Sequence, residues 1–213
     1  MAVAVQVDFC KRDFAGSGEV TRADIAGVIL AAGASSRMGQ PKALLEYEGE
    51  AFLSRLSRIL GEACGRVIVV LGYDAEKVGA VAPGGVEVAV NPAPELGMLS
   101  SLQCGLRLAE DSEAVLFLPV DYGAVQAATV ARIAAEAGAA DVIVPVFEGL
   151  HGHPVCISRR IASELLALPV LAQARDVIHR HRASTLYIAV DDAGIVNDVD
   201  TPEEYRALVE AGR

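Results

Sequence analysis

Short runs of apolar residues alternate with longer segments of helical periodicity from residue 25 to the end of the chain. The apolar runs predict β-strands, and the longer alanine-rich segments predict α-helices. Strands are expected at residues 27–31, 67–72, 86–90, 114–119, 141–147 and 185–190. Helices are expected at residues 51–63, 99–109, 124–138, 161–168, 171–182 and 201–211.

Several predicted strands are apolar without interruption, as in Val67-Ile68-Val69-Val70. Such strands are typical of a parallel sheet that is buried on both faces. The alternation with helices therefore predicts an α/β fold of three layers, α/β/α, with a Rossmann-like, mostly parallel central sheet. The last helix has a clear start, because Thr201 can cap it, Pro202 suits its first turn and two glutamates follow.

The chain is expected to form one domain, residues 25–213, preceded by an arm, residues 1–24. The arm has weak periodicity and contains Gly16-Ser17-Gly18, although it can still add an edge strand to the sheet. No internal repeat, low-complexity segment or linker divides the rest of the sequence.

Acidic residues outnumber basic ones by 28 to 18, which gives the 213-residue chain a formal net charge of −10. This balance argues against nucleic acid or an anionic membrane as a partner, because proteins that bind them use clustered Lys and Arg. Hydrophobic residues make up 53% of the chain and tryptophan is absent, so the core is expected to be aliphatic.

The four cysteines, Cys10, Cys64, Cys104 and Cys156, are scattered and lack the spacing of metal ligands. They are expected to be reduced core residues. No apolar run is long enough to span a bilayer, and the first residues do not have the pattern of a secretory signal. These features predict a cytoplasmic protein.

A loop with the chemistry of an anion site follows the first predicted strand, at residues 33–42. Ligands bind at the carboxyl ends of strands in open parallel sheets, and small residues there let backbone N–H groups surround phosphate oxygens. The hydroxyls of Ser35 and Ser36 add donors, and Arg37 and Lys42 add two cations. The plainer alternative is a tight turn with two solvated basic residues. The spacing fits neither a Walker loop nor G-x-G-x-x-G.

Residues 30–42 read L-A-A-G-A-S-S-R-M-G-Q-P-K. They resemble the signature L-A-A-G-x-S-x-R-M-G-x-x-K of the nucleotidyltransferases that activate the molybdenum cofactor. The short spacing from Arg37 to Lys42 is similar to that branch, since sugar-phosphate nucleotidyltransferases tend to have a longer one. The segment Leu30-Ala31-Ala32-Gly33 is more similar to cytidylyltransferases than to guanylyltransferases, which tend to have L-A-G-G.

A second block, at residues 91–105, resembles the family pattern N-P-x-x-x-x-G-x-x-x-S-L-x-x-G. A serine at the start of the predicted helix can place its free N–H groups near an anion or a base edge. A plain helix cap is the alternative. The resemblance implies that this region surrounds the nucleotide, and Gly72, at the end of the second predicted strand, is expected in the same site. The nucleotide-binding residues expected outside the 30–42 loop are Gly72, Asn91, Gly97, Ser100 and Ser101.

Asp121 ends a buried apolar strand, which suits either a ligand-binding carboxylate or a helix cap. The resemblance implies that it binds magnesium, and Mg²⁺ prefers such hard oxygen ligands together with phosphate oxygens. Residues 197–204 match N-D-[VI]-D-T-P-E-[DE], in which Asp198 and Asp200 share one face of an extended segment and either can join the metal. Asp200 and Thr201 can alternatively only cap the helix. Tyr122-Gly123 departs from the family, which tends to have Gln-Pro or Met-Pro after the aspartate.

Gly152-His153-Pro154-Val155 resembles a G-H-P-[VL] block that lies near the acceptor in the family. His151 and His153 are therefore acceptor-binding candidates, although a polar turn explains them equally well. Arg175 is a third candidate, in a segment that matches the family less regularly. Arg180, His181 and Arg182 are better explained as a solvated end of the helix.

The resemblance implies a Mg²⁺-dependent nucleotidyltransferase fold and activity over residues 25–211. A phosphate acceptor, molybdopterin in this family, would attack the α-phosphorus of a nucleoside triphosphate, most simply CTP, and release pyrophosphate. Arg37 would stabilise pyrophosphate, Lys42 the α-phosphoryl oxygens, and Asp121 the metal. Two alternatives stay open: a sugar or alditol phosphate acceptor, and a nucleotide-binding assembly factor without turnover. A molybdenum hydroxylase is a further possible partner.

Overall fold

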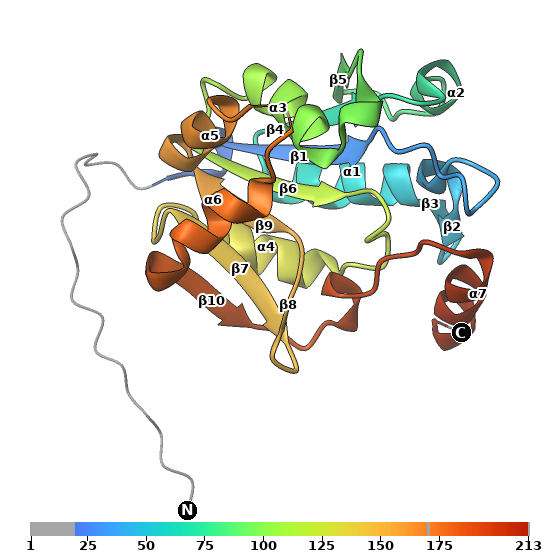
Figure 1. Ribbon diagram of the computed structural model, residues 1–213. Coiled ribbons are helices and arrows are strands. Elements are labelled where there is room, and N and C mark those ends of the chain that lie inside the picture. Colours follow the sequence, from blue (N-terminus) through green and yellow to red (C-terminus); the bar gives the residue numbers. More distant parts are fainter. Residues whose placement is uncertain (1–19, 170, 213) are drawn as a thin grey trace, which may run out of the picture.

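A central sheet between two layers of helices forms the protein in the computed structural model, which describes residues 20–169 and 171–212 (Figure 1). The expected arm, residues 1–24, lies largely outside the described residues, as does Cys10. Residues Arg22–Asp24 form a 3₁₀ turn, and the Arg22 guanidinium donates to the carbonyl of Gly61. The end of the expected arm is thus attached to the domain.

The main sheet has the strand order β10-β7-β9-β6-β1-β4-β5, with β8 paired to β7. Its strands are β1 (Ile25–Ala31), β4 (Arg66–Leu71), β5 (Glu87–Val90), β6 (Ala114–Pro119), β7 (Val142–Phe147), β8 (Leu150–His151), β9 (Val155–Ser158) and β10 (Thr185–Ala189). The pairs β1–β4, β1–β6, β4–β5 and β7–β10 are parallel, whereas β8 and β9 run antiparallel to their neighbours. The prediction of a mostly parallel sheet is confirmed.

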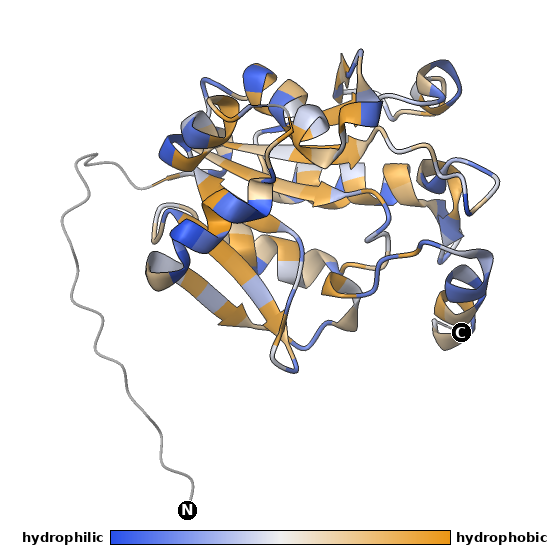
Figure 2. Ribbon diagram, viewed as in Figure 1, coloured by the Kyte–Doolittle hydropathy of each residue, from blue (hydrophilic) through white to orange (hydrophobic). Residues whose placement is uncertain are grey.

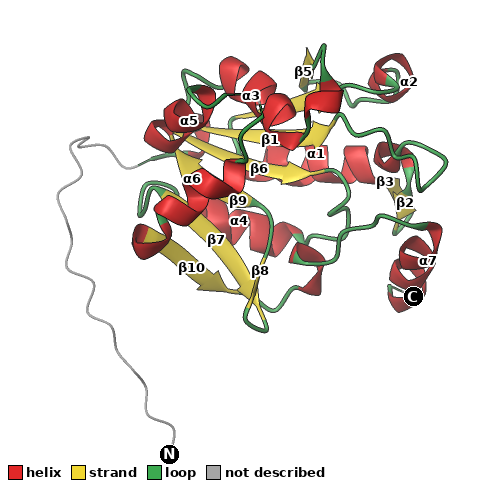
Figure 3. Cartoon of the chain, viewed as in Figure 1, coloured by secondary structure: helices red, strands yellow, loops and turns green. Residues whose placement is uncertain are grey.

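Two apolar clusters, one on each face of the sheet, give the fold its three layers (Figure 3). Helices α1 (Phe52–Ala63) and α4 (Ala127–Ala135) cover one face, and α7 (Pro202–Ala211) packs at the edge of this layer, where Tyr205 contacts Phe52. Helices α3 (Met98–Leu108), α5 (Arg159–Leu166) and α6 (Ala174–Arg180) cover the other. Because both faces are covered, the central strands are apolar along their length (Figure 2). The core is aliphatic, as the composition predicts.

The predicted strands and helices are all present, but five short elements were not expected. These are the hairpin of β2 (Glu46–Tyr47) and β3 (Glu50–Ala51), helix α2 (Ala75–Gly79), β8 and β9. The central position of β9, between β6 and β7, was missed because its apolar run is only a few residues long and follows a polar Gly-His-Pro turn. Helix α6 also begins at Ala174, later than the predicted 171.

The cysteines in the described residues match the expectation of free thiols. Cys64 and Cys156 are buried and Cys104 is half-buried, and burial raises the pKa of Cys64 to about 12. Within residues 20–169 and 171–212, no helix is long and apolar enough to cross a membrane.

Helix α3 approaches the sheet closely because residue 105 is glycine. A Cβ atom there would lie 2.6 Å from Cγ1 of Val28 and 3.0 Å from Cγ2 of Val70. Both valines belong to central strands that are fully covered, so neither can move aside easily. This contact fixes the distance between α3 and the sheet. The first turn of α3 borders the cleft described below.

Gly105→Ala is therefore expected to lower the free energy of unfolding by about 1–3 kcal/mol, because the added methyl overpacks the core. Gly61→Ala in α1 is the matched control, since a Cβ atom there meets nothing closer than 3.9 Å. That control should stabilise the protein by about 0.5–1 kcal/mol through helix propensity alone. Urea unfolding measures both, and equal effects of the two variants would contradict the close packing of α3.

Candidate active site

A cleft of about 570 Å³ lies at the carboxyl ends of β1, β4 and β6. It contains most of the residues that the sequence suggested for nucleotide and metal binding. The expected residues that line it are Leu30, Ala31, Ala32, Gly33, Ser35, Ser36, Arg37, Lys42, Gly97, Ser101, Asp121, His153, Asp198 and Asp200. Ligands of open α/β sheets bind in this position, so the cleft is the candidate active site.

The loop between β1 and Lys42 folds back on itself through Ser35. Its hydroxyl oxygen accepts a hydrogen bond from the backbone N–H of Lys42, with 3.1 Å between Oγ and N. Its carbonyl accepts from the N–H groups of Met38 and Gly39. Ser35 has a φ of +49°, which costs a non-glycine residue energy and is typical of functional turns. The closed loop holds Arg37 and Lys42 at the same mouth of the cleft.

Two cations and two carboxylates meet where this loop faces the end of β6. The Lys42 ammonium donates to Oδ2 of Asp121 at 3.0 Å and also to Oδ1 of Asp200. Arg37 binds the other oxygen of Asp200, with 2.7 Å between Nη2 and Oδ2. The Lys42 side chain is only 13% exposed, whereas that of Arg37 is 67% exposed. Lys42 is thus the enclosed centre of the network, and Arg37 is its solvent-facing member.

Asp198 and Asp200 reach the cleft because their segment is attached to the end of β6. The N–H of Val199 donates to the carbonyl of Asp121 at 3.1 Å, and the Val199 side chain is buried. Side chains alternate along an extended segment, so the two neighbouring aspartates both turn toward the cleft. Helix α7 starts directly afterwards with a capping box between Thr201 and Glu204, as predicted.

The pKa values of the three central groups reflect this arrangement. Desolvation opposes the charge on Lys42, but the hydrogen bonds and charges of Asp200 and Asp121 outweigh it and raise its pKa. The hydrogen bond from Lys42 lowers the pKa of Asp200. Burial raises the pKa of Asp121, and the nearby charge of Asp198 adds to this effect, although Lys42 opposes both.

Asp121 keeps one oxygen available to a further ligand. Its Oδ1 is buried and has no hydrogen-bond partner among the described residues, which is costly unless something binds it. Within residues 20–169 and 171–212, no three His, Cys, Asp or Glu side chains are gathered into a complete metal site. Mg²⁺ needs only one or two carboxylates when phosphate oxygens supply other ligands. Asp121 and its neighbour Asp198 therefore fit such an ion.

Asn91 and Ser100 stand behind the cleft wall and do not line it. The buried amide of Asn91 donates to the hydroxyls of Ser100, at 2.8 Å, and Ser101, at 3.0 Å. Ser100 in turn donates to the carbonyl of Gly97, whose φ of +94° only glycine adopts readily. Of Ser100 and Ser101, only Ser101 lines the cleft. Asn91 thus positions the start of α3 and does not itself line the cleft.

Gly72 also lies outside the lining. A Cβ atom there would be 2.7 Å from the carbonyl oxygen of Ala32 and 2.8 Å from Cβ of Pro94. Gly72 therefore lets the loops after β1 and β5 come together, and its contribution to the cleft is close packing.

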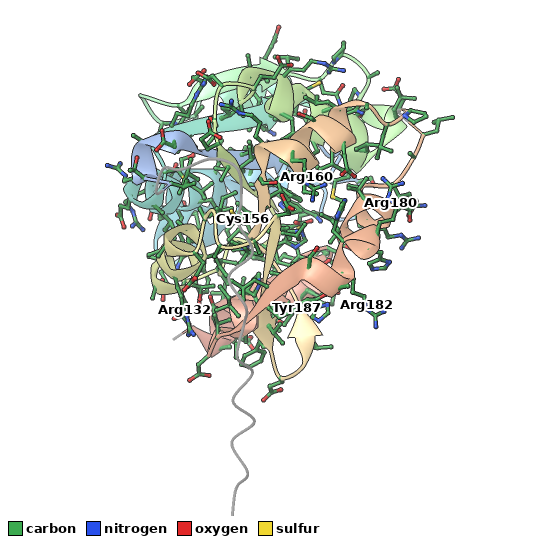
Figure 4. All side chains as sticks on the ribbon, turned by 90° about the vertical axis from the view of Figure 1, so that its left-hand side faces the viewer. Arg132, Cys156, Arg160, Arg180, Arg182 and Tyr187 are labelled. Carbon is green, nitrogen blue, oxygen red and sulfur yellow. The ribbon has the colours of Figure 1, made fainter. Side chains whose placement is uncertain are left out.

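Of the three candidates for acceptor binding, the structure brings only His153 to the cleft. His151 lies on β8, where its ring stacks on Tyr187 with 4.6 Å between centroids. Arg175 is exposed on α6 and does not line the cleft. At the end of α6, Arg180 and Arg182 are exposed, as expected, on the side of the molecule that Figure 4 turns to the viewer. His181 departs from the expectation, because its side chain is only 18% exposed and pairs with Glu164.

His153 forms an aromatic pair with Tyr122, a residue that the sequence marked only as a departure from the family. Their ring centroids are 4.6 Å apart, and Phe117 meets the His153 ring edge-on at 6.2 Å. Burial lowers the pKa of His153 to about 4, so the imidazole is neutral near pH 7. The cleft lining also includes Tyr73, Pro94 and Met98, whose residue types alone carried no signal of a ligand.

Comparison with known families gives the site an identity. The model of the MobA-like NTP transferase domain matches residues 27–185. The chain belongs to this family. The resemblance seen in the sequence is thereby confirmed, and the protein is a nucleotidyltransferase of the MobA-like type.

Relatives of the MobA-like domain carry different names. A molybdenum cofactor guanylyltransferase of Xanthomonas euvesicatoria is 29% identical over 86% of this chain and 93% of its own length. A molybdenum cofactor cytidylyltransferase of Escherichia coli is 24% identical over 84% of this chain and 92% of its own length. A nicotine blue oxidoreductase of Paenarthrobacter nicotinovorans is 30% identical over 86% of this chain and 96% of its own length.

Solved structures share the fold of the MobA-like domain. Rv0371c from Mycobacterium tuberculosis superposes with a TM-score of 0.79 and is 32% identical, covering 90% of this chain and 98% of its own. Its complex with manganese has a TM-score of 0.73 at 29% identity, covering 88% and 98%. That structure shows that a relative of this fold binds a divalent metal ion.

Lys42→Met is expected to raise the pKa of both Asp121 and Asp200. Each carboxylate loses a hydrogen bond and a positive charge that favour its ionised form, while the burial of Asp121 and the charge of Asp198 remain. Carboxyl ¹³C NMR titration measures the two values. Lys77→Met, at an exposed position on α2, is the matched control and should leave both unchanged. Unchanged pKa values of Asp121 and Asp200 in Lys42→Met would contradict the ion-pair network.

Proposed function

We propose that the protein transfers CMP from CTP to the phosphate of a molybdopterin-type acceptor, with Mg²⁺, and releases pyrophosphate. The observation that supports this most is the meeting of Lys42, Asp121 and Asp200 at one cleft, with Arg37 beside them. These groups come from segments far apart in the chain. The residues on the cleft therefore include both the cations that a triphosphate needs and carboxylates for its metal ion.

The reaction exchanges one phosphoanhydride bond for another. An oxygen of the acceptor phosphate forms a bond to the α-phosphorus of CTP, and the bond from that phosphorus to the β-phosphate oxygen breaks in line. The electron pair leaves with pyrophosphate. Because a phosphate acceptor is already anionic, no side chain has to remove its proton. The protein mainly positions the two anions and offsets their charge.

The two cations have distinct places in this scheme. Lys42, enclosed at the end of β1, faces the α-phosphoryl oxygens, where charge develops in the transition state. Arg37, at the exposed rim, faces the departing pyrophosphate. For either contact to form, Lys42 and Arg37 exchange part of their bonding with Asp200 for phosphate oxygens. The carboxylates of Asp121 and Asp198 would hold Mg²⁺, which supplies charge compensation for the phosphates when bound.

The preference for CTP rests on the similarity of residues 30–33, Leu-Ala-Ala-Gly, to cytidylyltransferases, since guanylyltransferases tend to have L-A-G-G. Ala32 is among the residues that line the cleft, so this difference lies at the candidate site. Relatives named for each nucleotide exist, so both CTP and GTP belong in the test.

The assay that tests this function follows pyrophosphate release by purified protein with Mg²⁺ and molybdenum cofactor. CTP is expected to support turnover better than GTP. Parallel reactions with an alditol phosphate test the alternative acceptor. Tight CTP binding without pyrophosphate from any acceptor would instead support the nucleotide-binding assembly factor. The similarity to a nicotine blue oxidoreductase adds one further arm, in which nicotine blue is offered to the protein as a substrate.

Residue roles are tested with Lys42→Ala and Asp121→Ala. Lys42→Ala is expected to lower kcat by about 100–1,000-fold, with a smaller effect on CTP affinity, because its contact strengthens in the transition state. Asp121→Ala is expected to abolish the dependence on Mg²⁺ together with activity. Lys77→Ala and Asp191→Ala, both exposed, are the matched controls. Full metal-dependent activity in Asp121→Ala would remove this residue from the metal site.

A further inference from the structure

The Tyr122–His153 pair lies on one side of the cleft, and the features assigned to the nucleotide lie on the other. Tyr122 follows β6 and His153 precedes β9, which is the neighbour of β6 in the sheet. Pro94 and Ser101 follow β5, Pro94 in a 3₁₀ turn and Ser101 in the first turn of α3, on the far side of β1. With the triphosphate on the loop after β1, the aromatic side is the one that remains for the acceptor.

The position of Tyr122 is fixed from behind. Gly123 lies against Phe52, because a Cβ atom at residue 123 would fall 2.3 Å from the Phe52 ring. The buried Arg55 donates to the carbonyls of Gly123, at 3.0 Å, and Val125, at 2.6 Å. The packing of Gly123 and the hydrogen bonds of Arg55 therefore fix the loop in which the sequence departs from the family. They hold Tyr122 beside the reaction centre.

The two rings present chemistry suited to a planar partner. No side-chain hydrogen bond of His153 is formed within the described residues, and its Nδ1 is buried without a partner. Tyr122 is half-buried, and its phenol lies within electrostatic range of Asp121, Asp198 and Asp200, close to where the acceptor phosphate would react. Aromatic side chains select flat rings through stacking, and unpaired polar atoms select matching donors or acceptors.

We propose that Tyr122, together with His153, forms an aromatic wall that selects an acceptor with a planar heterocycle close to its phosphate, such as a pterin. This inference rests on the proposed function for the side from which the acceptor enters. Tyr122 is then a specificity-determining residue. An open-chain alditol phosphate offers no flat face to this wall and should gain nothing from it.

The test compares Tyr122→Leu and Tyr122→Phe with the wild-type protein. Tyr187→Leu is the matched control, because Tyr187 also pairs with a histidine ring at 4.6 Å but lies on β10 and does not line the cleft. The first readout is equilibrium binding of hydroxymethylpterin monophosphate, followed by quenching of the pterin fluorescence in the presence of Mg²⁺. The second is KM for the pterin acceptor, for ribitol phosphate and for CTP in pyrophosphate release.

Tyr122→Leu is expected to weaken pterin binding and raise the KM for the pterin acceptor about 10-fold. The KM values for CTP and ribitol phosphate should stay within about twofold, and Tyr122→Phe and Tyr187→Leu should behave like the wild-type protein. Unchanged pterin binding in Tyr122→Leu would overturn the inference, and so would an equal increase in the KM for CTP. Should the leucine variant fail to fold, Tyr122→Ile, which also removes the aromatic ring, takes its place.

The two readouts separate this inference from the proposed function. If the wild-type protein binds the pterin through Tyr122 but releases no pyrophosphate, the proposed reaction fails and the aromatic wall stands. If pyrophosphate is released but Tyr122→Leu changes neither pterin binding nor the KM for the pterin acceptor, the proposed reaction is supported and the role of Tyr122 is contradicted. A wild-type protein that does not bind the pterin monophosphate also overturns the wall.

Discussion

The ion-pair network around Lys42 is the interaction on which the site depends. A largely enclosed ammonium is stable only with its charge compensated, and here Asp121 and Asp200 compensate it together. Removing one partner would leave a poorly solvated charge, so the network constrains where three separate segments can lie. A triphosphate with its metal ion brings the same two charges, anionic oxygens for Lys42 and a cation for the carboxylates. The free protein thus holds its reactive groups together by letting them neutralise one another.

The order of the strands brings these segments to one place. β1 lies between β4 and β6, so the loop after β1 meets the end of β6 on one side and the loops beyond β4 on the other. The segment after β10 closes the arrangement, because the N–H of Val199 bonds to the carbonyl of Asp121. Glycines and buried polar side chains behind the cleft, such as Gly72, Asn91 and Arg55, fix the loops without lining the cleft. The acidic surface implied by the net charge of −10 is locally interrupted by Arg37 and Lys42.

The layers of the fold and the chemistry of the loop after β1 could be predicted from the sequence, because both depend on local patterns. Apolar runs and helical periodicity give the layers, and the loop at residues 33–42 carries its chemistry in consecutive residues. What could not be predicted depends on partners distant in the chain. Asn91 is a polar residue in a matching motif, yet its amide is used by two serines. His151 and His153 are two residues apart, but one belongs to β8 and stacks on Tyr187 while the other faces the cleft. Tyr122 could not be recognised as a site residue from the sequence, because its contact with the His153 ring is visible only in the fold.

We infer that the Lys42 network binds a nucleoside triphosphate with its metal ion. A thermal-shift panel of the four ribonucleoside triphosphates with Mg²⁺ tests this most directly, because a ligand of the folded state raises the melting temperature according to its affinity. The largest increase is expected with CTP in the wild-type protein, and a much smaller one in Lys42→Met. An absence of any shift with all four nucleotides, or the same shift in both proteins, would contradict it.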